Sequence, residues 1–293
     1  MIMRKGLFFC IIVLLLSISG CSFSSKSDPS SNTKQVKSLP SKNAVTLTIA
    51  GSGSNLPITQ KLIDEYAKKT GIKLKMANSI GTEGAITALK ANQLDIGLIS
   101  RPLSQGEKKV GLIQKKYARI AIVLGVNFEV PDETITSEDL VKIYKGTKNK
   151  WKNGEMIIVL SREDGDSSTK ILEDKIPNFK QAFNESMKVK RWAIHYSDIE
   201  EATAIANTND SFGITNLTTA LKLNIKPLKI NGIPPTLDNI KNGKYPFYKD
   251  LYFSYKEPLS DQGKKFLEFV FSPEGQNIMS KNNCIPMIGD DSN

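Results

Sequence analysis

The sequence predicts an α/β fold, because short apolar strand patterns alternate with helical patterns along most of the chain. The apolar runs at residues 94–99, 120–126 and 156–160 are typical of buried strands. Helical periodicity occurs between such runs, as at residues 56–69 and 261–271. This alternation implies sheets covered by helices, with any ligand held at the carboxyl ends of strands.

The predicted elements follow one another from residue 45 to residue 280. Strands are expected where apolar residues alternate or form short runs, at residues 45–50, 72–76, 94–99, 120–126, 156–160, 212–215, 226–230 and 251–255. Helices are expected where apolar residues recur every three or four positions, at residues 56–69, 83–91, 136–144, 171–173, 178–187, 197–206, 261–271 and 273–280. Gly71 and Gly146 follow two of these helices, where glycine often ends a helix.

The N-terminus has the pattern of a secretion signal. Two basic residues precede an apolar stretch at 7–18, which is too short for a transmembrane helix. The sequence Ile-Ser-Gly-Cys at 18–21 resembles the lipobox of bacterial lipoproteins. That resemblance implies a signal peptide at 1–20 and acylation of Cys21 by fatty acids such as palmitate. The alternative is an ordinary signal peptide, or an anchor helix, with a cysteine by chance. We expect an extracytoplasmic protein, lipid-anchored to the cell membrane.

A flexible tether is expected between the lipid site and the globular part. The segment at 21–43 is rich in Ser, Lys, Asn and Pro and has few apolar residues. Such a composition buries too little surface to offset the loss of chain entropy. No later segment reaches transmembrane length. The rest of the 293-residue chain is long enough for one large domain or two lobes.

The cysteine, histidine and charge content exclude several kinds of site. Only Cys284 remains after Cys10 in the signal and Cys21 at the lipid site, so no intramolecular disulfide is expected. His195 is the only histidine, and we expect no metal site and no cofactor. The formal net charge is +10, but the basic residues are scattered and lack interleaved aromatic residues. A nucleic-acid partner is therefore not expected.

Three loops that precede predicted helices are rich in Ser, Thr and Gly, at 51–57, 80–85 and 162–169. Helix N-termini hold anions, because their first N–H groups are unpaired and carry partial positive charge. Thr82 is also a suitable helix cap. Arg162 adds a full charge and a planar fork suited to two oxygens. Each loop alone is more typical of a helix cap, but the three together with a secretion signal favour an anion receptor.

Longer motifs carry a resemblance to a known family. They are found at 51–54 with Pro57, 81–84, 94–103, 137–140, 144–146 with Trp151, 161–162, 165 with 167–169, 232–236, 243–246 and 272–276. In this order they resemble the phosphate-binding proteins of the phosphate-specific ABC transport system, from about residue 45 to about residue 287. The resemblance implies a two-lobed type II periplasmic-binding-protein fold. Each lobe would be a mixed sheet flanked by helices, with a ligand cleft between the lobes.

The resemblance also implies domain bounds and a function. Lobe I would comprise residues 44–126 and 247–293, and lobe II residues 127–246. The protein would be a monomer that captures inorganic phosphate and delivers it to the membrane subunits of an ABC importer. We do not expect an enzyme, because the chain has a single histidine, no Gly-x-Ser-x-Gly elbow and no nucleotide-binding phosphate loop.

Carried over position by position, the resemblance implies a set of ligand contacts. They are expected at Ser54, Asn55, Thr82, Ser100, Arg162, Ser167, Ser168 and Thr169. Ser100 departs from the family, since well-known members have there an Asp that accepts the proton of hydrogen phosphate. Asp166 departs from the family too: it either replaces the first Ser of a Gly-Ser-Gly-Thr turn or marks an insertion. Its carboxylate would repel a dianion unless it accepts the ligand's proton. The alternative is therefore a divergent receptor or sensor for another oxyanion or small anion.

Overall fold

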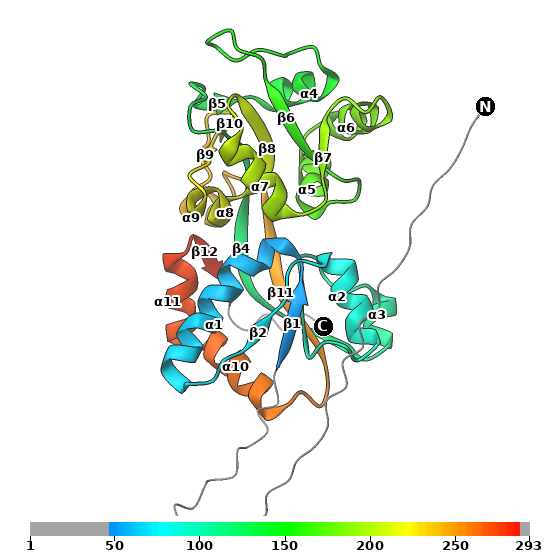
Figure 1. The fold of residues 1–293 in the computed structure, drawn as a ribbon, viewed down its shortest axis with the longest axis vertical. Coiled ribbons are helices and arrows are strands. Elements are labelled where there is room, and N and C mark those ends of the chain that lie inside the picture. Colours follow the sequence, from blue (N-terminus) through cyan, green and yellow to red (C-terminus); the bar gives the residue numbers. More distant parts are fainter. Residues whose placement is uncertain (1–46, 288–293) are drawn as a thin grey trace, which may run out of the picture. The chain divides into compact units, whose positions relative to one another are not determined.

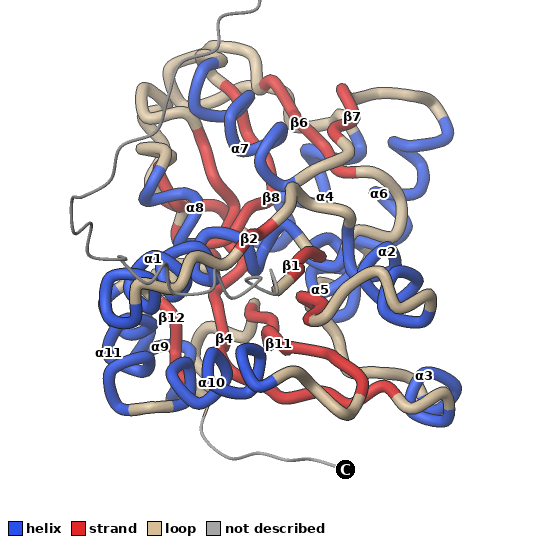
Figure 2. The backbone as a smooth tube through the Cα atoms, turned by 60° about the horizontal axis from the view of Figure 1, so that its bottom comes forward, coloured by secondary structure: helices blue, strands red, loops and turns tan. Residues whose placement is uncertain are grey.

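The structure, a computed structural model, describes residues 47–287. The predicted signal peptide at 1–20, the tether at 21–43 and the lipid site at Cys21 lie outside the described residues, as do residues 288–293. Within the described part, no helix has the length and apolar character needed to span a membrane. The predicted α/β fold is confirmed, because a mixed sheet is flanked by helices on both sides (Figure 1, Figure 2).

The secondary structure of residues 47–287 alternates between strands and helices. The strands are β1 (Thr48–Gly51), β2 (Lys75–Met76), β3 (Ile96–Ile99), β4 (Leu112–Val126), β5 (Thr134–Ile135), β6 (Ile158–Arg162), β7 (Ala193–His195), β8 (Ser211–Asn216), β9 (Lys226–Pro227), β10 (Lys229–Ile230), β11 (Tyr248–Lys256) and β12 (Cys284–Pro286). The helices are the short 3-10 helix η1 (Gly53–Asn55), α1 (Leu56–Thr70), α2 (Gly81–Lys90), α3 (Gln105–Lys109), α4 (Ser137–Lys145), α5 (Ser167–Lys175), α6 (Phe179–Lys188), α7 (Asp198–Asn207), α8 (Leu217–Lys222), α9 (Leu237–Lys241), α10 (Asp261–Phe271) and α11 (Pro273–Lys281).

One sheet runs through most of the described chain. Its strand order is β2-β1-β3-β11-β4-β8-β6-β7, and β9 and β12 also pair with β4. Strands β1, β2 and β3 are parallel, whereas β11 is antiparallel to both β3 and β4. β4 pairs with β11 along its first part and with β8 along its last part, so this strand belongs to both halves of the sheet (Figure 1). The loops that follow β1, β3 and β6 lie at the carboxyl ends of parallel strands.

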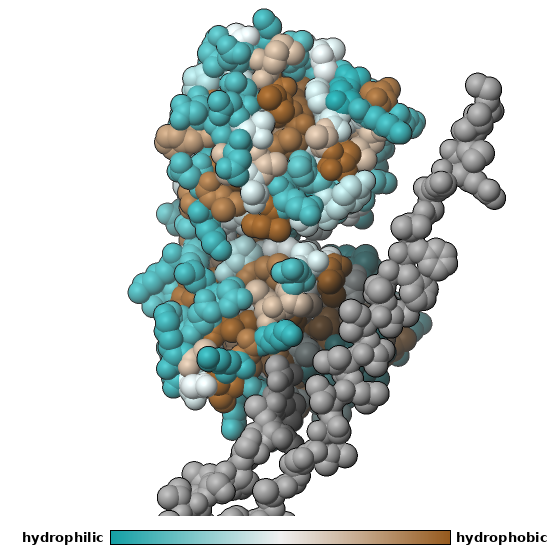
Figure 3. Space-filling model, in the orientation of Figure 1, coloured by the Kyte–Doolittle hydropathy of each residue, from teal (hydrophilic) through white to brown (hydrophobic). Residues whose placement is uncertain are grey.

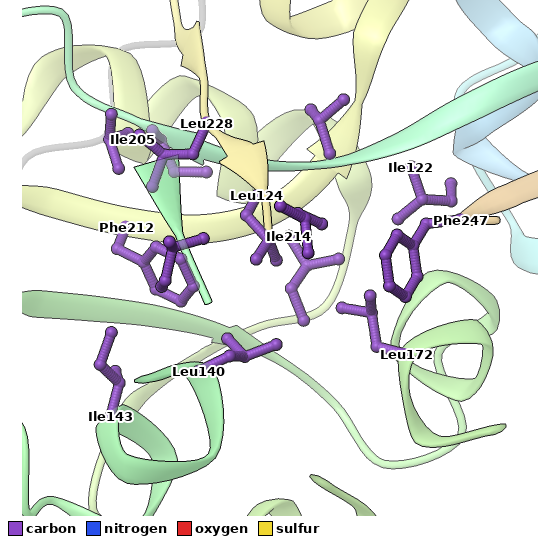
Figure 4. Close-up of a cluster of buried hydrophobic side chains, with 14 of the residues drawn as sticks. Ile122, Leu124, Leu140, Ile143, Leu172, Ile205, Phe212, Ile214, Leu228 and Phe247 are labelled. Carbon is purple, nitrogen blue, oxygen red and sulfur yellow. The ribbon is translucent and has the colours of Figure 1, made fainter. Parts of the chain in front are cut away.

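Two large hydrophobic cores, and a smaller one beside α2 and the end of β3, fill the space between the sheet and its helices. In one core, Tyr117 of β4 stacks on Phe253 of β11 with ring centroids 4.1 Å apart. In the other, Phe212 and Ile214 of β8 pack among side chains of β4 and the helices (Figure 4). All residues of β8 are buried, because elements cover both faces of the sheet there. Burial of this apolar area is the main favourable term in the folding of each half.

The two cores divide inside β4 and near the start of β11. Tyr117, Ala118 and Ile120 of β4 belong to the core around Phe253, and buried hydrophobic residues from Ala121 to Phe247 belong to the core around Phe212. Leu251 belongs again to the first core. The chain therefore passes between the cores on two extended strands. The sequence suggested lobe bounds at residues 126 and 246. These bounds stay a prediction, because they concern which parts move together and not which side chains pack together.

The largest departure from the predicted elements is the start of β4, which lies at Leu112 instead of residue 120. The early part of the strand is rich in charged residues, which hid it in the sequence pattern. Those charges have partners across the sheet: Arg119 Nε lies 2.6 Å and Lys116 Nζ lies 3.2 Å from carboxylate oxygens of Asp250 on β11. No prediction covered β5, β7, β12, α3, α8 and α9, which are too short to show a clear sequence period.

Gly51 ends β1 and lies directly against Leu98 of β3. Its φ is +154°, and a Cβ atom built there would lie 2.1 Å from the carbonyl oxygen of Leu98. No heavy atom can occupy that position without movement of the backbone. Glycine at this position therefore lets β1 deliver the loop that follows it to the edge of the sheet.

We predict that Gly51→Ala lowers the free energy of unfolding by about 2 kcal/mol or more, since it overpacks a dense core against backbone atoms. Gly106→Ala on α3 is the control, because a Cβ there meets nothing within 4 Å. We expect the control to be neutral or slightly stabilising. Urea unfolding of both variants measures the difference, and equal stability of the two would contradict the close approach at Gly51.

Candidate functional site

A cleft of about 790 Å³ lies between the two halves of residues 47–287. One wall is formed by the loops after β1 and β2 and by the end of β3. The other is formed by the end of β6, the first turn of α5 and the start of α7, and β11 contributes further lining residues. The notch between the halves is visible in Figure 3, on the side where α2 and α5 lie in Figure 1.

Hydrogen bonds tie the first wall together around Ser100. The Ser100 hydroxyl donates to Ser52 Oγ at 2.8 Å and accepts from Asn55 Nδ2 at 2.9 Å. The Ser100 N–H donates to Thr82 Oγ1 at 3.1 Å. The loops after β1, β2 and β3 therefore form one connected surface. Ser100, Ser52 and Thr82 line the cleft, whereas Asn55 is fully buried behind it.

Tyr117 holds Asn55 in place from the core side. Its hydroxyl donates to Asn55 Oδ1 at 2.8 Å and lies 3.2 Å from Thr59 Oγ1. Burial raises the pKa of Tyr117 above its ordinary value, so the phenol remains protonated and can donate. Because Asn55 accepts from Tyr117 with its oxygen, its amide nitrogen faces Ser100. The orientation of Ser100 is thus set from inside the core.

Arg162 ends β6 and is only 5% exposed. Its Nε and Nη2 each donate to the Glu163 carboxylate at 2.9 Å, and Nε also lies 3.2 Å from the backbone oxygen of His195. Its Nη1 donates to the Asp198 carboxylate and lies 3.4 Å from Asp166 Oδ2. Burial lowers the pKa of Arg162, but these carboxylates outweigh it and raise the pKa above its ordinary value. The guanidinium is therefore a permanent buried cation.

Asp166 is the N-cap of α5. Its Oδ1 accepts from the N–H groups of Ser168 and Thr169, both at 2.9 Å, and from Thr169 Oγ1 at 3.1 Å. This cap explains why α5 begins at Ser167, earlier than the predicted start at residue 171. Ser168 and Thr169 are buried with their N–H groups bound to the cap, and Ser167 lines the cleft.

Lys249 of β11 connects the two walls, and sequence reasoning did not predict it. It is 3% exposed, and its Nζ donates to Ser54 Oγ at 2.7 Å and to Ser167 Oγ at 2.9 Å. Burial lowers the pKa of Lys249 below its ordinary value, and the nearby Asp198 and Asp166 oppose this only in part. The only signal in the sequence is a charged residue inside the run Tyr-Pro-Phe-Tyr-Lys-Asp-Leu-Tyr-Phe. That pattern is equally typical of an outward-facing side chain on a strand.

Asp198 also lines the cleft and was not predicted. It is the first residue of α7, where Ser197 is the N-cap. Ser54 Oγ donates to Asp198 Oδ2 at 2.6 Å, and the other carboxylate oxygen accepts from Arg162. Burial raises the pKa of Asp198, but Lys249 and Arg162 outweigh it, so the pKa lies below its ordinary value. The side chain is therefore an ionised carboxylate between the two walls.

The predicted ligand contacts divide into two groups. Thr82, Ser100, Arg162 and Ser167 line the cleft. The other four, Ser54, Asn55, Ser168 and Thr169, are buried and hydrogen-bonded to neighbouring side chains. Direct contact of any of the eight with a ligand stays a prediction. In residues 47–287 no group of three or more His, Cys, Asp or Glu side chains is arranged to hold a metal ion.

Comparisons with known proteins identify a family and several relatives. The sequence pattern of the PBP superfamily domain matches residues 31–274. The phosphate-binding protein PstS of Borreliella burgdorferi is 22% identical over 248 residues, which cover 82% of this chain and 89% of that protein. The protein of the same name from Staphylococcus epidermidis is 24% identical over 242 residues, or 77% of this chain and 74% of that protein.

A solved structure from Clostridium perfringens shares the fold. It is described as a phosphate ABC transporter substrate-binding protein with bound phosphate, and it superposes with a TM-score of 0.72. The match covers 83% of this chain and 99% of that chain, at 24% identity. The two-lobed architecture expected from the sequence is therefore confirmed.

We predict that Tyr117→Phe lowers the free energy of unfolding by about 1–3 kcal/mol, because it leaves the buried Asn55 oxygen without its donor. Tyr66→Phe, in the same core, is the control, since its hydroxyl carries neither of the bonds that Tyr117 makes. Denaturant unfolding of the two variants gives the comparison. A loss in Tyr117→Phe no larger than in Tyr66→Phe would show that Asn55 is not held from the core.

Proposed function

The chain belongs to the PBP superfamily, and from this premise we propose that it captures inorganic phosphate outside the cell. The relatives from B. burgdorferi and S. epidermidis are named for phosphate binding, and the C. perfringens structure holds phosphate. In this proposal the protein delivers its anion to the membrane subunits of an ABC importer. It binds and releases the anion and carries out no reaction.

The observation that carries the proposal is the meeting of buried cations and hydroxyl groups at one cleft. Arg162 and Lys249, which are 5% and 3% exposed, come from different strands. Thr82, Ser100 and Ser167 line the same space from both walls. Donors of this kind, two of them charged, suit a small oxyanion with several acceptor oxygens. Arg162 is proposed to bind two oxygens, with the three hydroxyls donating to the others.

Binding is proposed to close the cleft. β4 and β11 are the strands that pass between the two cores, and bending there would bring the proposed lobe I, residues 44–126 and 247–293, towards lobe II, residues 127–246. An anion in contact with both walls stabilises the closed form. The free energy of this stabilisation equals the difference between its binding free energies for the closed and the open form. Hydrogen bonds to a charged ligand contribute roughly 1.5–3 kcal/mol each. Several of them can reach micromolar affinity, which corresponds to about −8 kcal/mol.

The proposed location follows from the N-terminal sequence. Removal of residues 1–20 would leave Cys21 at the new N-terminus, and its acyl chains would hold the protein at the outer face of the cell membrane. Residues 21–43 would then act as the tether between lipid and globular part. A monomer in this arrangement can meet an importer in the same membrane.

A second candidate function is a receptor or sensor for another oxyanion or small anion. It is favoured by the chemistry at Ser100 and Asp198. Ser100 places a neutral hydroxyl where well-known phosphate receptors have a carboxylate, and Asp198 places a carboxylate between Ser54 and Arg162. The two candidates differ in their ligand and share the same cleft.

The test is calorimetric titration of the full chain with phosphate, arsenate and sulfate at about pH 7. We expect phosphate and arsenate to bind and sulfate to bind weakly or not at all. Thr82→Ala removes one hydroxyl donor at the cleft and should weaken phosphate binding by about tenfold or more. Thr87→Ala, at an exposed position of the same helix, is the matched control. Absence of phosphate binding by the folded chain would overturn the proposal, and tight binding of sulfate alone would favour the second candidate.

A further inference from the structure

The Asp198 carboxylate makes the contacts that an anion bridging the cleft would make. One of its oxygens accepts from the Ser54 hydroxyl of the first wall at 2.6 Å. The other accepts from Arg162 of the second wall. Lys249, which donates to the same Ser54 hydroxyl at 2.7 Å, adds a positive charge nearby. The two oxygens and the negative charge of the Asp198 carboxylate thus lie among the hydrogen-bond donors of the cleft.

The position of this carboxylate is determined by its surroundings. Asp198 begins α7, where the partial positive charge of the helix N-terminus favours an anion. A Cβ atom built on Gly53 would lie 3.0 Å from both Cβ and Oδ2 of Asp198, so the side chain packs directly on the loop after β1. The contact therefore connects the two walls directly.

Arg162 has few donors to spare while Asp198 is in place. Nε and Nη2 donate to the Glu163 carboxylate. Nη1 donates to the Asp198 carboxylate and lies 3.4 Å from Asp166 Oδ2. A guanidinium has five N–H donors. An incoming anion that is to bind both Arg162 Nη1 and the Ser54 hydroxyl must take the place of Asp198, because that carboxylate accepts from both groups.

Building on the proposed function, we propose that Asp198 is a specificity-determining residue whose carboxylate acts as an internal anion, so that a ligand binds only by displacing it. A monoanion with two or three oxygens gains little over the carboxylate it replaces. A tetrahedral dianion brings four oxygens and a second charge to the same donors, and it can therefore compete. The internal anion lowers the affinity for every ligand and excludes weakly charged ones.

The experiment compares the full chain with its Asp198→Asn variant by calorimetry, with phosphate as the titrant. Asparagine keeps the size of the side chain and removes its charge, so Arg162 and Lys249 lose their shared counter-charge. We expect phosphate to bind Asp198→Asn at least tenfold more tightly than the natural chain. Glu200→Gln removes a charge from an exposed position in the first turn of the same helix and should leave the affinity within about twofold, because exposed charges are largely screened.

A second variant, Asp198→Ala, tests the same idea with a different probe. It leaves space for a small carboxylate between Ser54 and Arg162, so formate should raise its melting temperature and leave that of the natural chain unchanged. This result also supports the proposal if Asp198→Asn does not fold. Formate that stabilises neither protein would count against an internal anion.

The outcomes separate this inference from the proposed function. Phosphate binding to the natural chain, with equal or weaker binding to Asp198→Asn, would overturn the internal anion and leave the receptor function standing. An equal gain of phosphate affinity in Glu200→Gln would show that overall charge causes the effect, and it would also overturn the internal anion. Phosphate binding to Asp198→Asn alone would support the inference and overturn phosphate as the ligand of the natural chain. Absence of binding to both proteins would reject the inference and the receptor function together.

Discussion

The site depends on the burial of two cations, Arg162 and Lys249, at the junction of two walls. A buried charge without partners is strongly destabilising, so the surrounding residues must supply acceptors. Glu163 and Asp198 do this for Arg162, while hydroxyl groups do it for Lys249. The same bonds join β6, β11, α7 and the loop after β1. The need to neutralise these cations therefore shapes the cleft, whether the counter-charge comes from the protein or from a ligand.

The sheet explains how distant segments reach this junction. β4 and β11 are long antiparallel strands that belong to both halves, and Lys249 lies where β11 leaves one core for the other. The loops after β1, β3 and β6 lie at carboxyl ends of parallel strands, as is usual for ligand sites in α/β folds. Gly51 allows the first of these loops to start against β3. Local turns and long-range strand pairing thus both contribute to the position of the donors.

Sequence reasoning reached the α/β fold, most helices and the loops of the cleft, because these depend on local patterns. The cleft-lining positions of Thr82 and Arg162 were predictable for the same reason, since a Thr near the start of a helix and an Arg at the end of a strand are visible in a short window. Lys249 and Asp198 were missed, because a Lys in a strand and an Asp in a first helical turn usually face solvent. Their burial results from contacts with residues far away in the chain, such as Ser54. The early part of β4 was missed because its charges are paired only across the sheet.

We propose that an oxyanion binds between Ser54 and Arg162, in the place that the Asp198 carboxylate holds in this structure. A crystal structure of the full chain grown with arsenate tests it most directly, because the anomalous signal of arsenic locates the anion. We expect a single strong peak within hydrogen-bonding distance of Arg162 and the first-wall hydroxyls, with the Asp198 carboxylate moved away. A structure in which Asp198 still bonds to Ser54 and Arg162, with no arsenic in the cleft, would contradict it.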